Sequence, residues 1–245
     1  MCNTFYDWKD FELTPYGKIK LDFLNIIKKY PKERIGTPYT PLAVVLPKDL
    51  FGIAGLDDGD NQTVFGYPLF GSAAETMKNV RKALKSLLSN PSDMVGCEKA
   101  NIINSNIPDC IDVIHKDYTN LYEDYKYFID LTGNPEFNKN HRCVSVEEAP
   151  ETLKNLLPCE VNGGVHWFVN KTANDWLLVM FNNSGIERSV EKGEYVLPEG
   201  TRKVSVRLKN GHNLNVLEGA NDIHFENDAY HFELQPGEWI LAEFA

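Results

Sequence analysis

The sequence predicts a mixed fold, with an α/β half built on a parallel sheet followed by an all-β half that forms an antiparallel β-sandwich. Two observations predict it. Helix-type and strand-type patterns alternate in the first half, whereas after Leu157 short β-prone segments follow one another between turns. The pattern changes within residues 143–162. We therefore expect an N-terminal segment at residues 1–16, an α/β domain at 17–145 and a sandwich domain at 146–245.

The first half opens with a helix pattern over residues 17–30, which Pro31 ends. The apolar residues of this helix recur at helical spacing and are expected to face the core: Ile19, Phe23, Ile26, Ile27 and Tyr30. "TPLAVVLP", residues 40–47, is a continuous apolar run of the kind that forms a buried parallel strand. A second helix is predicted at residues 72–88, where a capping pattern precedes an apolar stripe. Two further strands are predicted in "CIDVIH" and "YKYFIDLTG", with a short helix or turn between them.

The second half contains six segments of strand-type composition, separated by Gly, Asn and Pro turns. They are "VHWFVN", "DWLLVMFNN", "RKVSVRLKNG", "NLNVLEG", "AYHFELQPG" and "EWILAEFA". The piece before them, "VEEAPETLKNLLP", has the composition of a linker or a short helix. Several short strands at this spacing indicate an antiparallel sandwich or barrel, and a sandwich is our expectation.

The composition limits the classes of partner. Lysine and arginine total 25 against 35 aspartates and glutamates, which gives a net charge of −10. A chain this acidic, without a clustered basic stripe, is not expected to bind nucleic acid, whereas neutral ligands such as sugars remain compatible with it. No apolar run approaches the roughly 18 residues that span a bilayer, so no membrane partner is expected. The N-terminus lacks the pattern of a signal peptide, and we expect a soluble protein.

The cysteines and histidines do not indicate a metal site. The 5 cysteines are widely scattered and form no CxxC pair, which argues against a disulfide framework and against zinc. Reduced, buried thiols would favour a cytoplasmic location. The 6 histidines show neither HxH nor HExxH spacing. "LDDGDNQ" at residues 56–62 lacks the ligand positions of a calcium loop and is better explained as a turn. We expect no metal and no cofactor.

Three stretches together resemble parts of glycoside hydrolases. "DFELTPYGKIKLDFLNIIKKYP" followed by "GTPYTPLAVVLP" resembles the junction after the catalytic barrel, and "IPDCIDVIHKDYTNLYEDYKYFIDLTGNPEF" is similar to the amidotransferase-like, flavodoxin-like domain that comes next. "GGVHWFVNKTANDWLLVMFNNSGIER" and "ELQPGEWILAEF" look like the first hairpin and the last strand of the C-terminal β domain. The trimeric microbial β-galactosidases and their relatives have this order of domains.

This resemblance implies that the catalytic barrel is missing from the chain. Residues 1–16 resemble the segment that leaves the barrel, and a TIM barrel needs roughly 250 residues. Phe11, Leu13 and Tyr16 would then have packed against a barrel. Because the two catalytic carboxylates of the family lie on barrel strands, we assign no catalytic residue. Glu12, in the same segment, is the one carboxylate that we consider for binding, although a solvated rim residue is the more ordinary explanation.

Two alternatives use other residues. The first is a glycan-binding module in which Trp167, Trp176 and Trp239, all in predicted strands, stack on sugar rings. Tryptophan in a sandwich strand is more often part of the core. The second is a thiol-dependent hydrolase of the amidotransferase-like class, with Cys97 or Cys110 as its nucleophile. Neither cysteine has the small flanking residues that a nucleophile elbow requires.

Our leading hypothesis is therefore a non-catalytic accessory region of a carbohydrate-active enzyme. Its expected role is scaffolding and oligomer contact, with a second copy of the chain or a TIM-barrel protein as partner and a glycan as a further possible ligand. Exposed apolar residues at a domain edge tend to be covered by a partner, which is the physical reason for this expectation.

Overall fold

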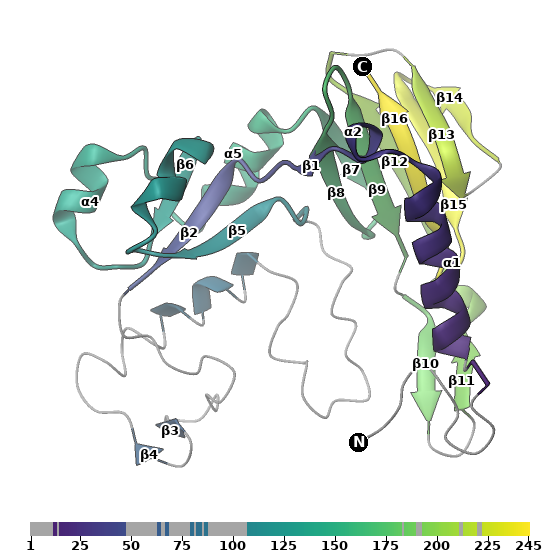
Figure 1. Ribbon diagram of the computed structural model, residues 1–245, viewed down its shortest axis with the longest axis horizontal. Coiled ribbons are helices and arrows are strands. Elements are labelled where there is room, and N and C mark those ends of the chain that lie inside the picture. Colours follow the sequence, from purple (N-terminus) through teal and green to yellow (C-terminus); the bar gives the residue numbers. More distant parts are fainter. Residues whose placement is uncertain are drawn as a thin grey trace.

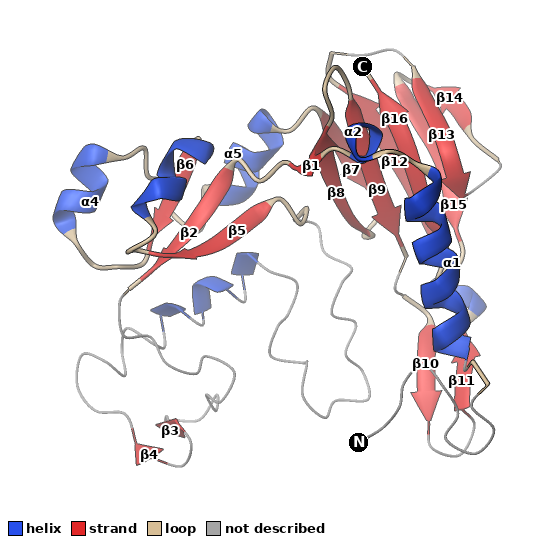
Figure 2. Ribbon diagram, in the orientation of Figure 1, coloured by secondary structure: helices blue, strands red, loops and turns tan. Residues whose placement is uncertain are grey.

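The structure is a computed structural model that describes residues 12–13, 15–47, 63–64, 67–68, 79–80, 82–84, 86–87, 107–182, 184–189, 193–210, 213–219 and 222–245. It combines a small parallel sheet with antiparallel sheets and several helices, as the sequence predicts at this level (Figure 1). In the view of Figure 2 the parallel sheet and its helices lie on the left, and the five-stranded and four-stranded antiparallel sheets lie on the right.

The parallel sheet has three strands in the order β5-β2-β6. β2 (Leu42–Leu46) lies at its centre and pairs in parallel with β5 (Ile111–His115) and with β6 (Tyr127–Asp130). These are the three strands expected in this half. The run from Leu42 to Val45 is completely buried, as a strand with neighbours on both edges and cover on both faces must be.

Both faces of the parallel sheet are covered. On one face, Leu42 and Val44 pack with α5 (Ala149–Leu156) and with helical residues inside the predicted 72–88 helix, of which Val80, Leu84 and Leu87 are buried. On the other face, Ala43 and Val45 pack with Phe128 and Phe137. Phe137 belongs to α4 (Pro135–Asn140), which Asn134 caps by accepting a hydrogen bond of 3.1 Å from the Glu136 amide. The turn η3 (Thr119–Asp124) lies between β5 and β6.

The larger antiparallel sheet has five strands in the order β1-β8-β9-β16-β13. Four of them correspond to predicted segments: β8 (His166–Lys171), β9 (Trp176–Phe181), β16 (Trp239–Phe244) and β13 (Leu214–Gly219). β1 (Thr37–Pro38) was not predicted, and it pairs antiparallel with the end of β8 although the two strands lie far apart in the chain.

The second antiparallel sheet has four strands in the order β14-β15-β12-β7. β12 (Arg202–Leu208) and β15 (Ala229–Leu234) correspond to predicted segments, whereas β7 (Cys159–Asn162) and β14 (His224–Glu226) do not. Buried residues of the two sheets form one cluster that continues to the parallel sheet, and its members include Met180, Ile240, Val206, Phe232 and Leu42. The two antiparallel sheets therefore face each other across a shared core.

Short elements complete the described chain. Two-stranded pairs form between β3 (Thr63–Val64) and β4 (Tyr67–Pro68), and between β10 (Ile186–Ser189) and β11 (Gly193–Val196). A single 3-10 turn, η4 (Pro198–Gly200), leads into β12.

The first helix packs on the all-β half. α1 (Pro15–Lys29) carries lysines in its last turn, which complement the helix dipole, and it ends before Pro31 as predicted. α2 (Lys32–Ile35) follows directly. Ile26, Tyr30 and Ile35 form a cluster with Leu177 and Leu241, whose side chains leave the five-stranded sheet on the face opposite to the shared core. The first helix thus covers the outer face of this sheet (Figure 1).

Candidate interaction surface on the first helix

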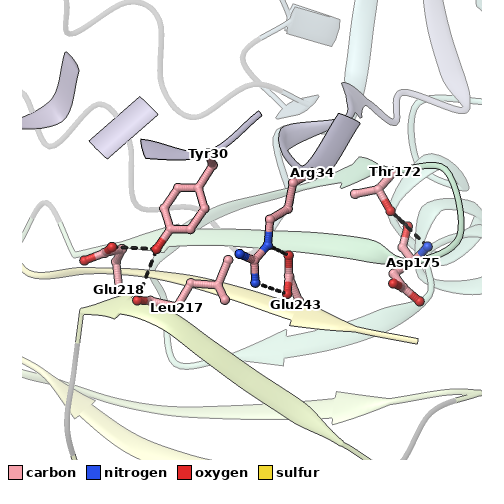
Figure 3. Close-up of polar contacts among 7 residues, drawn as sticks. All are labelled: Tyr30, Arg34, Thr172, Asp175, Leu217, Glu218 and Glu243. Atoms are coloured by element: carbon pink, nitrogen blue, oxygen red, sulfur yellow. Dashed lines mark hydrogen bonds and ion pairs between the residues drawn. The ribbon is translucent and has the colours of Figure 1, made fainter. Parts of the chain in front are cut away.

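Two sets of polar contacts fix α1 and α2 on the five-stranded sheet (Figure 3). The Tyr30 hydroxyl donates a hydrogen bond of 2.6 Å to the Glu218 carboxylate and lies 3.5 Å from the Leu217 carbonyl oxygen. Lys29 forms an ion pair with the same carboxylate. The pKa of Glu218 lies below its usual range, mainly because the Lys29 ammonium donates a hydrogen bond to this carboxylate. The end of α1 is therefore tied to β13.

The second set joins α2 to the last strand. Arg34 donates to both oxygens of the Glu243 carboxylate, with 2.8 Å between Nη2 and Oε2. Its guanidinium also lies over the Tyr30 ring, 5.1 Å from the ring centre. The hydrogen bond from Arg34 lowers the pKa of Glu243. A two-point arginine–carboxylate pair fixes orientation as well as distance, so α2 cannot turn relative to β16 without breaking it.

A large part of the apolar surface of α1 does not reach this sheet. Leu21, Phe23, Leu24 and Ile27 have exposed fractions of 45%, 53%, 40% and 39%. We call these four residues the α1 face. The pairs Leu21–Leu24, Leu24–Ile27 and Phe23–Ile27 are three or four residues apart, so each of these pairs is adjacent on the helix surface, and together the four residues span a wide arc of it. The apolar arc of α1 is thus wider than the strip that the sheet covers, because Ile26 is the one α1 residue with a described side chain in the cluster, next to Tyr30 just after the helix.

Four exposed apolar side chains on one helix are a candidate for a protein interface. Soluble proteins expose single apolar residues freely, but a contiguous patch marks an interaction surface. Because the helix is fixed by the Tyr30 and Arg34 contacts, a partner would meet the patch without first ordering it.

The sequence pointed to this region but not to these residues. We expected Phe11, Leu13 and Tyr16 to supply the apolar surface and Phe23 and Ile27 to face the core. Leu13 is half-buried, while Phe11 and the side chain of Tyr16 lie outside the described residues. Phe23 and Ile27 are instead exposed, so the expectation that they are core residues was wrong. The feature of the sequence that could have indicated their exposure is the width of the apolar arc on this helix, which is larger than one packing face needs.

The candidate binding residues from the sequence occupy different surroundings. Glu12 is exposed at the start of the described chain. Trp167 is only 5% exposed and belongs to the shared core, so its ring is not open to a sugar. Trp176 is half-buried and its ring meets the ring of Tyr39 edge-on at 5.0 Å between centres. The structure does not bring these three residues together into one site.

The described thiols are poor nucleophiles. Cys110 is completely buried, and burial raises its pKa to about 12. Burial also raises the pKa of Cys159 and of the half-buried Cys143. A nucleophilic cysteine must form a thiolate near neutral pH, which a desolvated site opposes. Cys97, the other candidate nucleophile, lies outside the described residues. The whole "LDDGDNQ" stretch at residues 56–62 also lies outside them.

Two Asn-X-Ser/Thr patterns are structural. The Asn170 side chain is 6% exposed and donates a hydrogen bond of 2.9 Å to the Ile35 carbonyl oxygen. Asn182 is fully buried and donates to the carbonyl oxygens of Gly200 and Leu234 at 2.8 and 3.0 Å. These asparagines connect chain segments, and in the folded protein their amides are not accessible to a modifying enzyme.

Comparison with known proteins gives no assignment. No protein-family model matches the chain, and no curated protein matches it either. Within the described residues, no group of three or more His, Cys, Asp or Glu side chains is placed to hold a metal ion. Among the described helices, none has the length and apolar character needed to cross a membrane.

Proposed function

We propose that this chain is a non-catalytic assembly module of a carbohydrate-active enzyme system, and that it associates with a second copy of itself through the α1 face. The α1 face carries the proposal. The enzyme class rests on the resemblance to glycoside hydrolases described above.

The fold supports the proposal at a finer level. The order β5-β2-β6, with the first strand at the centre and the next two on either side, is the order in which a flavodoxin-like sheet begins. Two antiparallel sheets contribute residues to one buried cluster, which supports a β-sandwich. We therefore propose an amidotransferase-like domain with a β-sandwich, which is the domain pair that follows the barrel in the trimeric β-galactosidases.

Covering the α1 face would contribute favourable free energy to association, which has to exceed an association cost of about 4–15 kcal/mol. Full burial of a large apolar side chain contributes about 1.5–3 kcal/mol. Leu21, Phe23, Leu24 and Ile27 are each about half exposed, so covering them would contribute on the order of 1 kcal/mol per residue. The same four residues from a second copy would double this contribution, because a two-fold interface uses one patch twice.

The experiment is light scattering coupled to size-exclusion chromatography over a wide range of protein concentration. We expect the natural chain to associate and the double variant Phe23→Glu/Ile27→Glu to remain monomeric, with a dissociation constant raised at least tenfold. Phe225→Glu is the matched control, because Phe225 is 59% exposed on β14 and lies outside the α1 face. All three proteins should have the same circular dichroism spectrum, since the changed side chains are exposed.

Two outcomes would contradict the proposal. A natural chain that stays monomeric at all concentrations would exclude the second copy as partner, and the α1 face would then have to meet a different protein, such as a separate barrel. Association that the Phe225→Glu change weakens as much as the double variant does would place the contact elsewhere.

A further inference from the structure

A groove of about 1110 Å³ lies at one end of the four-stranded sheet, on the all-β half of the molecule. Its lining comes from the end of β7, the start of β12, the strands β14 and β15, the end of β13, and the turn into β16 with Trp239. A volume of this size is at the upper end of what small-molecule sites in proteins have. None of the four residues of the α1 face lines it.

Four polar side chains form a row across the floor of the groove. His224 pairs with His231 between β14 and β15, His231 pairs with Ser205 between β15 and β12, and Ser205 pairs with Asn162 between β12 and β7. Residues in direct register on neighbouring strands point to the same side of a sheet. All four residues line the groove. Each strand of the sheet therefore contributes one polar side chain to the row: two imidazoles, one hydroxyl and one amide.

Most of the row is not engaged within the protein. The side chains of Asn162 and Ser205 make no hydrogen bond to another residue that the structure describes. The rings of His224 and His231 stack at 5.4 Å between centres, with 20° between their planes. His231 Nε2 lies 3.1 Å from the Glu226 carbonyl oxygen, so this nitrogen is the donor of that bond.

The charged residues of the groove are largely paired. Lys203 forms an ion pair of 3.8 Å with Glu233, its cross-strand neighbour. Glu238 accepts a hydrogen bond of 2.7 Å from the backbone amide of Gln235 in the turn. The lining holds one lysine against the carboxylates of Asp222, Glu233 and Glu238, and the whole chain carries a net charge of −10. Phosphate and carboxylate ligands would therefore be repelled.

We propose that this groove binds a neutral, polyhydroxylated ligand, namely a short carbohydrate chain. Hydroxyl groups both donate and accept hydrogen bonds, and an amide, a hydroxyl and an imidazole can satisfy several of them at once. The row runs across four strands that lie about 4.8 Å apart, so it is long enough to contact more than one sugar ring. The sequence expectation placed a glycan on Trp167, Trp176 and Trp239, and of these three residues Trp239 lines the groove. The proposal is independent of the proposed assembly through α1.

The proposal is tested with the full chain by affinity gel electrophoresis in soluble neutral polysaccharides, with xyloglucan, galactan and pullulan as probes and polygalacturonate as the anionic counterpart. We expect retardation by at least one neutral polysaccharide and none by polygalacturonate. The double variant Asn162→Ala/Ser205→Ala should weaken the retarding interaction about tenfold, because two neutral hydrogen bonds are lost. Arg207→Gln is the matched control, since Arg207 is exposed on the same strand and does not line the groove.

Retardation that is equal in the natural chain and the double variant would overturn the proposal, as would retardation by polygalacturonate alone or by none of the probes. Both variants alter exposed or half-buried side chains, and an unchanged thermal midpoint in each establishes that any loss of binding is local. The Phe23→Glu/Ile27→Glu variant should bind the polysaccharide normally, which separates this test from the test of assembly.

Discussion

The Tyr30 hydroxyl donates a hydrogen bond of 2.6 Å to the carboxylate of Glu218, a residue 188 positions later in the chain. This bond joins the end of the first helix to β13 and lies beside the apolar cluster of Tyr30, Leu177 and Leu241. The position of the α1 face relative to the sheets therefore depends on a contact between the beginning and the end of the sequence.

Replacement of Tyr30 by phenylalanine should lower the free energy of unfolding by about 0.5–1.5 kcal/mol, the usual contribution of a hydrogen bond of this kind. The ring remains in place, so the loss reports on the hydroxyl alone. Urea denaturation followed by circular dichroism measures it. Tyr118→Phe is the matched control, because Tyr118 is 57% exposed and its change should leave the unfolding midpoint where it is. Equal midpoints for both variants would show that the Tyr30 contact does not stabilise the fold.

Acid should weaken the attachment of α1 and α2. Glu218 and Glu243 have pKa values lowered from 4.5, mainly by hydrogen bonds from Lys29 and Arg34. The folded state therefore binds fewer protons than the unfolded state, and the stabilisation is present above pH 4.5 and lost as the pH falls through the lowered values. Thermal midpoints measured from pH 7 to pH 3 should fall less steeply in the Glu218→Gln/Glu243→Gln variant than in the natural chain. Parallel curves would contradict this expectation.

Cys110 and Cys159 should be protected from alkylation in the native protein. Both are buried, and burial raises the pKa of both thiols, that of Cys110 to about 12. Iodoacetamide at pH 7 followed by peptide mass mapping should label neither until urea is added, and the half-buried Cys143 should react faster than either. Rapid labelling of native Cys110 would instead support the thiol-dependent hydrolase that the sequence left open.

The strands with continuous apolar or alternating patterns could be predicted from the sequence. β2 was recognised because four successive residues from Leu42 are apolar, and they are apolar because neighbours cover both faces and both edges. β7 was missed because "CEVN" has only two apolar residues, and it forms through pairing with β12 rather than through its own pattern. β1 contains a proline and has two residues, so only its pairing with β8 reveals it.

The candidate sites were harder to predict because they depend on which segments meet. The helix pattern of α1 showed an apolar stripe but not how much of it the sheet would cover, so Phe23 and Ile27 were assigned to the core. The row formed by His224, His231, Ser205 and Asn162 comes from four segments of sequence, and only the strand register aligns them. Trp167 followed the general rule that tryptophan in such strands is buried.

The pairing of β1 with β8 has a consequence for attempts to dissect the molecule. α1, α2 and β1 precede the parallel sheet in the chain but are attached to the five-stranded sheet that follows it. The all-β half is thus built from two stretches of the chain, and the strands of the parallel sheet lie between them in the sequence. An expression fragment that starts at residue 146 would lack an edge strand and the helix over Leu177 and Leu241. A fragment that also retains residues 15–38, rejoined by a short linker, would keep both.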